Sequence, residues 1–340
     1  MKFLQYNRGF FEKLLFSINF FNSLLILICC ILNYYYHPIF SFFSFLTFLF
    51  PIIYLINICF LIYWLIKIDI RVLLPVILLA ILFYNSFSFY KMGDKDVNDR
   101  VGFHIMSFNA RLFNHYNWIE NNNIPLNTKE FIFNNKPDLL AIQEYHGDYQ
   151  HLLDGFKNKH IHLSGNNVGQ SIHTDYNIIK KGIVEFDNSI NNAIFVDLII
   201  KKDTLRVYSA HFESFKVDLL NLKADLSSFK RVVNKIKLAY IAQKEQSSVL
   251  ISHIIKSPYK VILAIDLNNT QHSFVYKEIK SKMMDVFELK GFGFGSTYDF
   301  KFMPIRIDYI FISPSISANY FEIYNKKLSD HKPISAFIDI

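Results

Sequence analysis

Polar side chains that could do chemistry interrupt or follow short apolar segments in the distal part of the chain. In chain order they are Asn109 (SFNAR), Glu144 (LLAIQEY), His211 (YSAHFES), Asp266 and Asn268 (ILAIDLNN), Asp308 (RIDYIF), and Asp330 and His331 (LSDHKP). Strand ends and the loops that follow them commonly carry ligand-binding and catalytic groups. Metal-assisted cleavage of a phosphate ester needs hard oxygen ligands, a base for water and donors for the charge on phosphorus. This set contains all three kinds of group.

The motifs and their order resemble the endonuclease/exonuclease/phosphatase superfamily, over about Val101 to Ile340. Each motif alone is common, whereas six in the same order, with RIDYIF and LSDHKP near the C-terminus, are specific. The resemblance implies a metal-dependent phosphoesterase of the α+β class, a four-layered α/β-sandwich in which helices flank two mixed sheets. The family usually has Gly-Asp-Phe-Asn where this chain has Ile265, Asp266, Leu267 and Asn268.

The resemblance further implies a metal centre. Glu144 would be the principal ligand of Mg²⁺, with Mn²⁺ as a substitute ion, and a carboxylate suits a hard cation of this kind. Asn109 and Asp330 would assist the ion or its bound water. Arg111 and Tyr298 are expected to contact the substrate.

The catalytic roles that the resemblance implies fall on five residues. Asp266 would orient or deprotonate the attacking water, and Asn268 would stabilise the phosphate during transfer. His331, oriented by Asp308, would hydrogen-bond the scissile phosphate. His211 would serve either as a general acid or as a phosphate-binding donor. An Asp–His pair fixes the imidazole tautomer and favours its cationic form, which suits an anionic transition state.

The first 90 residues are expected to form a membrane anchor. Between residues 14 and 90 the charges are confined to one cluster, Lys67–Arg71. A spanning helix needs about 20 apolar residues, so this length must be divided. The expected spans are Leu14–Tyr36, Ile39–Ile66 and Val72–Tyr90. All three cysteines lie in this region, so the distal part has no disulfide and no thiolate metal site.

Positive charges in the short loops predict how the anchor is oriented. Lys2, Arg8 and Lys13 precede the first expected span, Lys67 and Arg71 lie between the second and third, and the first turn has no Lys or Arg. Because positive loops stay in the cytoplasm, the N-terminus is expected there and the catalytic domain outside. The predicted location is a bacterial-type inner (plasma) membrane.

After the anchor, residues 91–102 form an expected polar linker and residues 103–340 the expected catalytic domain. The expected strands are Phe103–Phe108, Leu139–Ile142, Phe195–Ile200, Leu205–Ala210, Val261–Ile265, Ile307–Ile312 and Ile334–Ile340. A helix is expected over Leu222–Ile255. Histidines such as His146 and His173 lack the spacing of a zinc site and are expected at the surface. The net charge is +7, and the part beyond the anchor is only mildly basic.

The sequence leaves the substrate open. The preferred candidate is an extracytoplasmic nuclease that cleaves phosphodiester bonds with a metal-activated water. The alternative is a phosphodiesterase or phosphatase of phospholipid headgroups, and a third, an inactive binding module, is disfavoured by the complete set of motifs. A basic groove around His331 would favour nucleic acid, and an apolar rim facing the bilayer would favour lipid. The expected partners are the phosphoester and the bilayer, and no protein partner is inferred.

Overall fold

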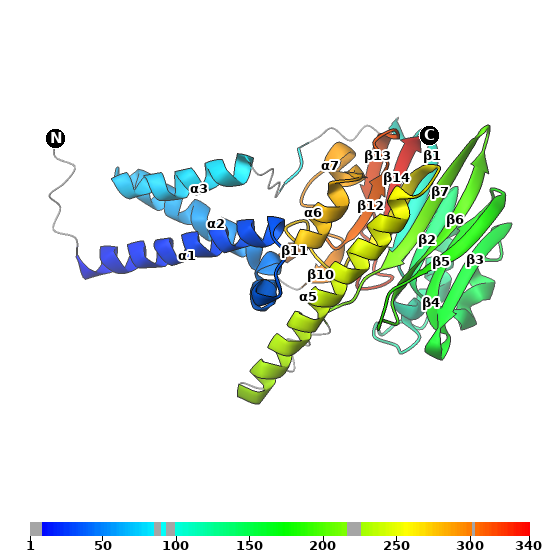
Figure 1. Cartoon of the computed structure of the whole chain (residues 1–340), viewed down its shortest axis with the longest axis horizontal. Helices are drawn as coiled ribbons and strands as arrows, with labels where there is room; N and C mark the ends of the chain where they lie inside the picture. Colours follow the sequence, from blue (N-terminus) through cyan, green and yellow to red (C-terminus); the bar gives the residue numbers. More distant parts are fainter. Residues whose placement is uncertain (1–8, 85–89, 93–98, 216–225, 301–302) are drawn as a thin grey trace.

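Apolar N-terminal helices project from a domain built on two β-sheets (Figure 1). The computed structural model describes residues 9–84, 90–92, 99–215, 226–300 and 303–340. Several features expected from the sequence therefore lie outside the described residues. They are Lys2 and Arg8, residues 85–89 of the third expected span, residues 93–98 of the linker and residues 222–225 of the expected helix.

The N-terminal region holds three apolar helices, α1 (Phe10–Tyr34), α2 (Leu46–Ile66) and α3 (Leu73–Tyr84), joined by the short helices η1 (Pro38–Phe43) and η2 (Ile70–Val72). By length and composition, α1 and α2 could each cross a membrane. The 12 described residues of α3 rise only about 18 Å, whereas the hydrocarbon core is about 30 Å thick. Two of the three expected spans thus have spanning length. The third expected span includes residues 85–89, which lie outside those described.

A single buried arginine organises the end of these helices that lies away from the sheets (Figure 1). Arg71 is 7% exposed, and its Nη2 lies 2.7 Å from Asp69 Oδ2 and 3.1 Å from Glu12 Oε2. Its guanidinium also lies 3.9 Å from the ring centroid of Trp64. A buried charge is tolerated when it is paired in this way, so the one charged cluster of the region joins α1 to the α2–α3 turn.

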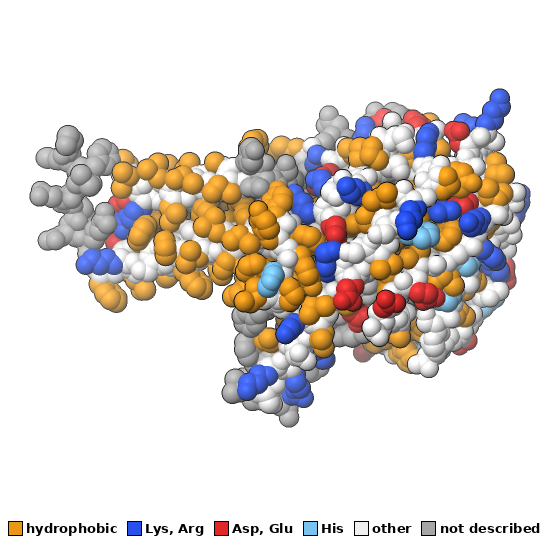
Figure 2. All heavy atoms as spheres, viewed as in Figure 1, with side chains coloured by type: hydrophobic (Ala, Val, Ile, Leu, Met, Phe, Trp, Pro, Cys, Tyr) orange, Lys and Arg blue, Asp and Glu red, His pale blue; other side chains and the backbone are white. Residues whose placement is uncertain are grey.

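The outer surface of the helices is apolar over most of its length (Figure 2). Phe21 and Leu55 are each 61% exposed, and Phe83 is 88% exposed. Contiguous apolar surface of this extent is rare on soluble monomers and marks a membrane or protein contact. The helices are therefore not the core of a soluble domain.

The domain contains two six-stranded mixed sheets. In spatial order the first comprises β13 (Ser317–Ile323), β14 (Ile334–Asp339), β1 (Phe103–Asn109), β2 (Leu139–His146), β4 (Val168–Thr174) and β3 (Asn158–Ser164). The second comprises β5 (Ile178–Glu185), β6 (Asn192–Ile200), β7 (Asp203–His211), β8 (Lys260–Asp266), β12 (Asp308–Ile312) and β9 (Met284–Asp285). The pairs β1–β2 and β7–β8 are parallel. β10 (Tyr298–Phe300) and β11 (Met303–Ile305) form a separate antiparallel pair.

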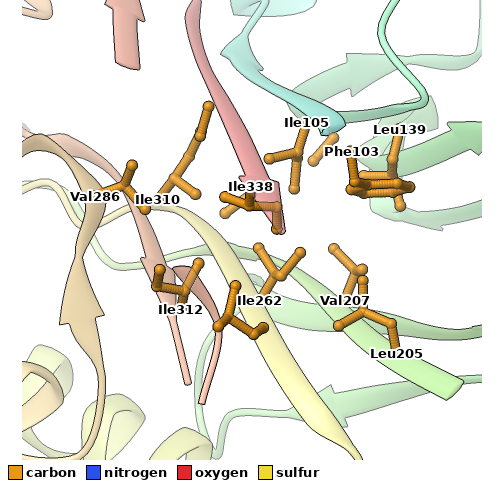
Figure 3. Close-up of a cluster of buried hydrophobic side chains, with 14 of the residues drawn as sticks. Phe103, Ile105, Leu139, Leu205, Val207, Ile262, Val286, Ile310, Ile312 and Ile338 are labelled. Carbon is orange, nitrogen blue, oxygen red and sulfur yellow. The ribbon is translucent and has the colours of Figure 1, made fainter. Parts of the chain in front are cut away.

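Side-chain alternation along the strands builds three apolar layers. Phe103 and Ile105 of β1 point into the cluster between the sheets, which Val207 and Ile262 enter from the opposite sheet (Figure 3). The intervening residues of β1 point to the other face, where Met106 packs beneath α4 (Ile124–Asn135). Helices α5 (Leu226–Ile255) and α6 (Phe274–Lys280) cover the outer face of the second sheet. Two sheets between helices form the expected sandwich.

A buried ion pair secures the segment that enters β12. Arg306 Nη1 lies 2.6 Å from Asp285 Oδ2, and the two side chains are 3% and 0% exposed. Tyr276 donates a second hydrogen bond to the same carboxylate oxygen at 2.7 Å. Asp285 also begins α7 (Val286–Lys290), where its Oδ1 accepts from the amide of Phe287. The pair therefore connects α7 with the start of β12.

Replacing Asp285 by Asn should leave the Arg306 guanidinium buried without its counter-charge. Breaking one partner of a buried ion pair typically costs about 3–5 kcal/mol of unfolding free energy. Urea unfolding of the detergent-solubilised chain should show this loss for Asp285→Asn. The exposed control Asp203→Asn should stay within about 0.5 kcal/mol of wild type. Equal stability of the two variants would contradict the assigned role of the pair.

Candidate active site

Sheet register brings three of the predicted residues side by side. His211 ends β7 and pairs with Asp266 at the end of the parallel strand β8. Asp308 pairs with Asp266 from the other side, because β12 runs antiparallel to β8. Asp308 therefore begins its strand instead of lying within it, as the expected strand Ile307–Ile312 implied. Because β12 runs antiparallel to β8, it begins at the edge of the sheet where β7 and β8 end.

A single amide joins the two sheets at this edge. Asn109 ends β1, and its Nδ2 donates to Glu144 Oε1 at 3.1 Å and to Asp266 Oδ2 at 2.8 Å. Glu144 belongs to the first sheet and Asp266 to the second, and Asp266 is completely buried. The amide therefore holds two carboxylates together that would otherwise repel each other.

Glu144 lies at an irregularity in β2. The expected strand ended at Ile142, but the observed strand continues to His146, and its register with β4 shifts between Ile142 and Tyr145. Glu144 has φ of +48°, a conformation uncommon outside glycine. Bulges of this kind re-aim a side chain next to a functional site. Here the carboxylate is turned toward Asn109 and remains partly accessible, at 31% exposure.

The predicted Asp308–His331 pair is formed. Nδ1 of His331 lies 3.1 and 3.0 Å from the two carboxylate oxygens of Asp308. Nε2 lies 3.9 Å from Asp266 Oδ2. Both members of the pair are nearly inaccessible to solvent. One ring nitrogen is thus fixed by Asp308, and the other faces the centre of the cluster.

Thr297 holds the backbone around this pair, and the sequence offered no signal for it. Its Oγ1 accepts hydrogen bonds from the amides of Ile307 and Asp308, each at 3.1 Å. Its carbonyl accepts from the amide of Lys332 at 2.7 Å. One buried threonine therefore connects the segments that carry Asp308 and His331.

Burial and charge pairing have opposite effects on the pKa values of His331 and Asp266. Burial acts to lower the pKa of His331. The negative charges of Asp308 and Asp266 together outweigh this effect and raise the pKa to about 10. Burial raises the pKa of Asp266 to about 6, while the charge of His331 acts in the opposite direction. At neutral pH the cluster therefore holds a cationic imidazole beside an ionised carboxylate. A cationic donor of this kind suits an anionic ligand.

Asn268 and His211 complete the inner group. Asn268 Nδ2 lies 3.0 Å from His211 Nε2 and 3.0 Å from the carbonyl oxygen of Phe212. The backbone amide of Asn268 donates to Asp266 Oδ1 at 2.9 Å. His211 Nε2 is also 3.5 Å from Asp266 Oδ2 and 3.7 Å from Glu144 Oε1. His211 thus lies near both carboxylates, and Asn268 contacts Asp266.

The remaining predicted residues lie beside this group. Arg111 Nη1 forms an ion pair with Asp330 Oδ2 at 3.0 Å, and its backbone amide donates to Asn109 Oδ1 at 3.0 Å. The ring of Tyr298 packs edge-on against His331, with centroids 5.0 Å apart. Burial raises the pKa of Tyr298, and the nearby carboxylate of Asp330 adds to the effect. For Asp330 to assist a metal ion, its pair with Arg111 would have to open.

A pocket of about 330 Å³ opens next to Glu144 and His211. Its polar walls come from the β3–β4 turn, the segment before β6 and the loop after β7. They carry neutral amides and hydroxyls from Ser164, Asn166, Gln170, Asn191, Asn192 and Ser214. None of the described residues that line it is Lys or Arg. Apolar side chains of Leu112, Val168 and Ile190 line the pocket beside these polar groups.

The donor set fits a hard divalent cation. Glu144 and Asp266 supply carboxylate oxygens that converge on one amide, and the partial exposure of Glu144 leaves a path from solvent. Oxygen donors of this type are typical of Mg²⁺ and Mn²⁺ sites. Asp266, Asp308 and His331 also bring one potential ligand atom each within 4.8 Å of one another. Nδ1 of His331 already donates hydrogen bonds to Asp308, which makes Glu144 the better candidate ligand.

Two protein families match the chain. The endonuclease/exonuclease/phosphatase family matches residues 106–331, and a domain of unknown function matches residues 12–90. No curated protein matches the sequence.

Solved structures of similar fold cover about 70% of the chain. A humanized D. rerio TDP2 with 14 mutations is 15% identical, with a TM-score of 0.56 over 70% of this chain and 99% of that one. An endonuclease/exonuclease/phosphatase from Bacteroides vulgatus is 18% identical, with a TM-score of 0.55 over 71% and 99%. A Bacteroides thetaiotaomicron mannosyl-6-phosphatase is 16% identical, with a TM-score of 0.52 over 70% and 100%. At these identities the similarity establishes the fold.

The charge of His331 should depend on Asp308. In the metal-free wild-type protein we expect the imidazole to remain protonated at pH 8, below its raised pKa of about 10. Asp308→Asn removes the negative charge that contributes most to raising the pKa of His331, while burial still lowers it. The pKa should therefore fall, and the ring should be neutral at pH 8. Imidazole ¹⁵N chemical shifts report this directly, with Asp203→Asn as the control. A ring that stays protonated in Asp308→Asn would show that other groups hold its charge.

Proposed function

Because the chain belongs to the endonuclease/exonuclease/phosphatase family, and is therefore a hydrolase of phosphoric ester bonds, we propose that it acts as a membrane-anchored, Mg²⁺-dependent phosphoesterase. The observation that carries the proposal is the Asn109 amide that joins Glu144 and Asp266 across the two sheets. Beside it stands the imidazole of His331, fixed by Asp308. Carboxylates for a cation and a charged donor for a phosphate thus meet at one point.

We propose that Glu144 is the main ligand of Mg²⁺ or Mn²⁺, with Asn109 nearby and Asp330 available if its ion pair opens. A bound ion would supply Lewis-acid stabilisation of the charge on the phosphate oxygens. Support comes from the oxygen-rich donor set and from the partial exposure of Glu144. The amide of Asn109 holds the neighbouring carboxylates in position before any ligand binds.

The other side chains are proposed to act on water and phosphate. Asp266, ionised at neutral pH, would orient the attacking water and accept its proton. Nε2 of His331 would donate to a phosphate oxygen, which gains charge as the reaction proceeds. The amide of Asn268 would donate to the same phosphate, and His211 would serve the leaving group or the phosphate. Donors fixed before reaction are the most effective form of such stabilisation.

The side chains that line the pocket help to choose between the candidate substrates. A nuclease remains a candidate, but nucleic-acid binding depends on Lys and Arg contacts to phosphates, and none of the described residues lining the pocket provides one. Its neutral amides and hydroxyls favour the second candidate, a phosphoester of a lipid headgroup. Further support comes from the apolar cluster of Ile305 and Ile307, against which Phe48 and Leu49 of α2 pack, because Ile307 directly precedes Asp308.

We propose that residues 1–90 anchor the enzyme and that residues 103–340 catalyse outside the cytoplasm, with residues 91–102 as the linker. Support comes from the exposed apolar surface of α1 and α2. It also comes from the turn between α2 and α3, which lies at the end of the helices remote from the domain (Figure 1) and contains Arg71. Positive residues mark the cytoplasmic end of a span.

Orientation can be tested by single-cysteine labelling of a variant whose three native cysteines are replaced. A cysteine at exposed Asp203 should react with an impermeant maleimide added to intact cells, because the domain lies outside. A cysteine at Lys67 should react only after the membrane is permeabilised. The reverse pattern would contradict the proposed orientation.

Metal dependence tests the proposed reaction. The full chain in detergent should hydrolyse at least one member of a panel of phosphoesters, comprising bis(p-nitrophenyl) phosphate, DNA and phospholipids, and only with Mg²⁺ or Mn²⁺ added. Glu144→Gln should raise the metal concentration needed for half-maximal rate, because a neutral amide is a poorer ligand. Glu185→Gln, at an exposed position of β5, is the matched control. Undiminished wild-type turnover after exhaustive chelation would exclude a metal-dependent mechanism.

A further inference from the structure

We propose that the first turn of α2 positions Asn268, so that the N-terminal helices form part of the catalytic scaffold as well as a tether. The inference rests on the proposed function of the site. Its basis is the loop Asn269–Ser273, which follows Asn268 directly and packs against the N-terminal helices. Asn269, Thr270 and His272 are each no more than 4% exposed, and the helices provide part of that cover.

Thr47, in the first turn of α2, contacts this loop with both its side chain and its backbone. Its hydroxyl lies 3.3 Å from Asn269 Oδ1 and 2.8 Å from the carbonyl of Ser44, so one proton is shared between two acceptors. Its carbonyl oxygen accepts from the hydroxyl of Thr270 at 3.1 Å. Buried polar groups need such partners, and losing one costs more than a surface hydrogen bond.

A chain of hydrogen bonds leads from this contact to the catalytic residue. Asn269 Nδ2 donates to Gln243 Oε1 at 2.8 Å, and Gln243 Nε2 lies 3.4 Å from the carbonyl oxygen of Asn268. The carbonyl of Asn269 accepts from the hydroxyl of Tyr309 at 3.0 Å. Asn269 is thus held from α2, α5 and β12, and the residue before it is Asn268, with φ of +49°. Asn adopts this left-handed conformation more readily than most residues, and the hydrogen bonds of Asn269 hold the backbone that follows it.

Apolar contacts strengthen the same junction. The ring of Phe50 packs on His272 with centroids 4.2 Å apart. Phe48 and Leu49 of α2 pack against the cluster formed by Ile305 and Ile307, and Ile307 directly precedes Asp308. The amide of Leu267 donates to the carbonyl of Ile307 at 2.9 Å, so the segments carrying Asn268 and Asp308 share one contact with α2.

The test uses the full chain in lipid nanodiscs and compares Thr47→Val with the matched control Thr128→Val. Thr128 is equally buried, lies on α4, and its hydroxyl has no hydrogen-bond partner among the described residues. Thr47→Ser keeps the hydroxyl and should restore wild-type behaviour. A second pair, Phe50→Leu on α2 and Phe20→Leu on the exposed face of α1, tests the apolar contact without removing an apolar residue.

Two readouts decide the question. Amide hydrogen exchange of the loop at residues 268–273 should accelerate by about three- to tenfold in Thr47→Val, as expected for the loss of one buried hydrogen bond. With the best substrate of the panel, kcat should fall by about tenfold with KM nearly unchanged, because a small misplacement of a catalytic donor slows reaction more than binding. Phe50→Leu should act in the same direction, and both controls should match wild type.

Wild-type exchange in both Thr47→Val and Phe50→Leu would overturn the inference. Faster exchange with unchanged kcat would also overturn it, because the contact would then not reach Asn268. Failure of the proposed function looks different. In that case the wild-type protein would cleave no phosphoester of the panel, while loop exchange would still show whether α2 holds the loop.

Discussion

The hydrogen bonds from the Asn109 amide to Glu144 and Asp266 are the interaction on which the rest of the site depends. They can form only if the ends of β1, β2 and β8 meet, which requires the two sheets to pack with their edges aligned. The apolar cluster between the sheets enforces this alignment, since displacing it would expose residues such as Ile105 and Ile262. Core packing therefore sets the distance between the two carboxylates, and that distance decides whether one cation can be shared.

The sequence predicted a set of candidate residues that the structure brings close together, because chemistry restricts which side chains can serve. Carboxylates, amides and imidazoles after apolar segments stand out, and their order pointed to the family that the chain matches over residues 106–331. The sequence could not predict how these side chains are arranged, because the register of a sheet depends on two paired strands. Asp308 begins β12 and faces Asp266 only through antiparallel pairing, and Thr297 carries no local signal. Several strands, among them β3, β4 and β13, were missed because their alternation is broken by polar residues.

The sequence also did not predict which side chains are buried or which distant segments are in contact. His146 and His173 were expected at the surface and are buried instead, since they lie on β2 and β4 of the first sheet. Composition revealed that the N-terminal residues are apolar, and α1 and α2 have spanning length. It could not reveal that Thr47 and Phe50 lie against the loop after Asn268, because no spacing in the sequence records a contact across more than 200 residues. The helices and the domain share a packed junction, so the two parts of the chain are mechanically connected.

The central claim is that His331 and Asp308 act as one unit on an anionic transition state. A double-mutant cycle on kcat for phosphoester hydrolysis tests it most directly, with folding of each variant verified by circular dichroism. His331→Ala should lower kcat by about 10²–10³, and Asp308→Asn should lose much of the same factor. Because residues of one unit are not additive, the double variant should be little slower than His331→Ala alone. Losses that multiply in the double variant, or wild-type turnover in a folded His331→Ala protein, would contradict the account.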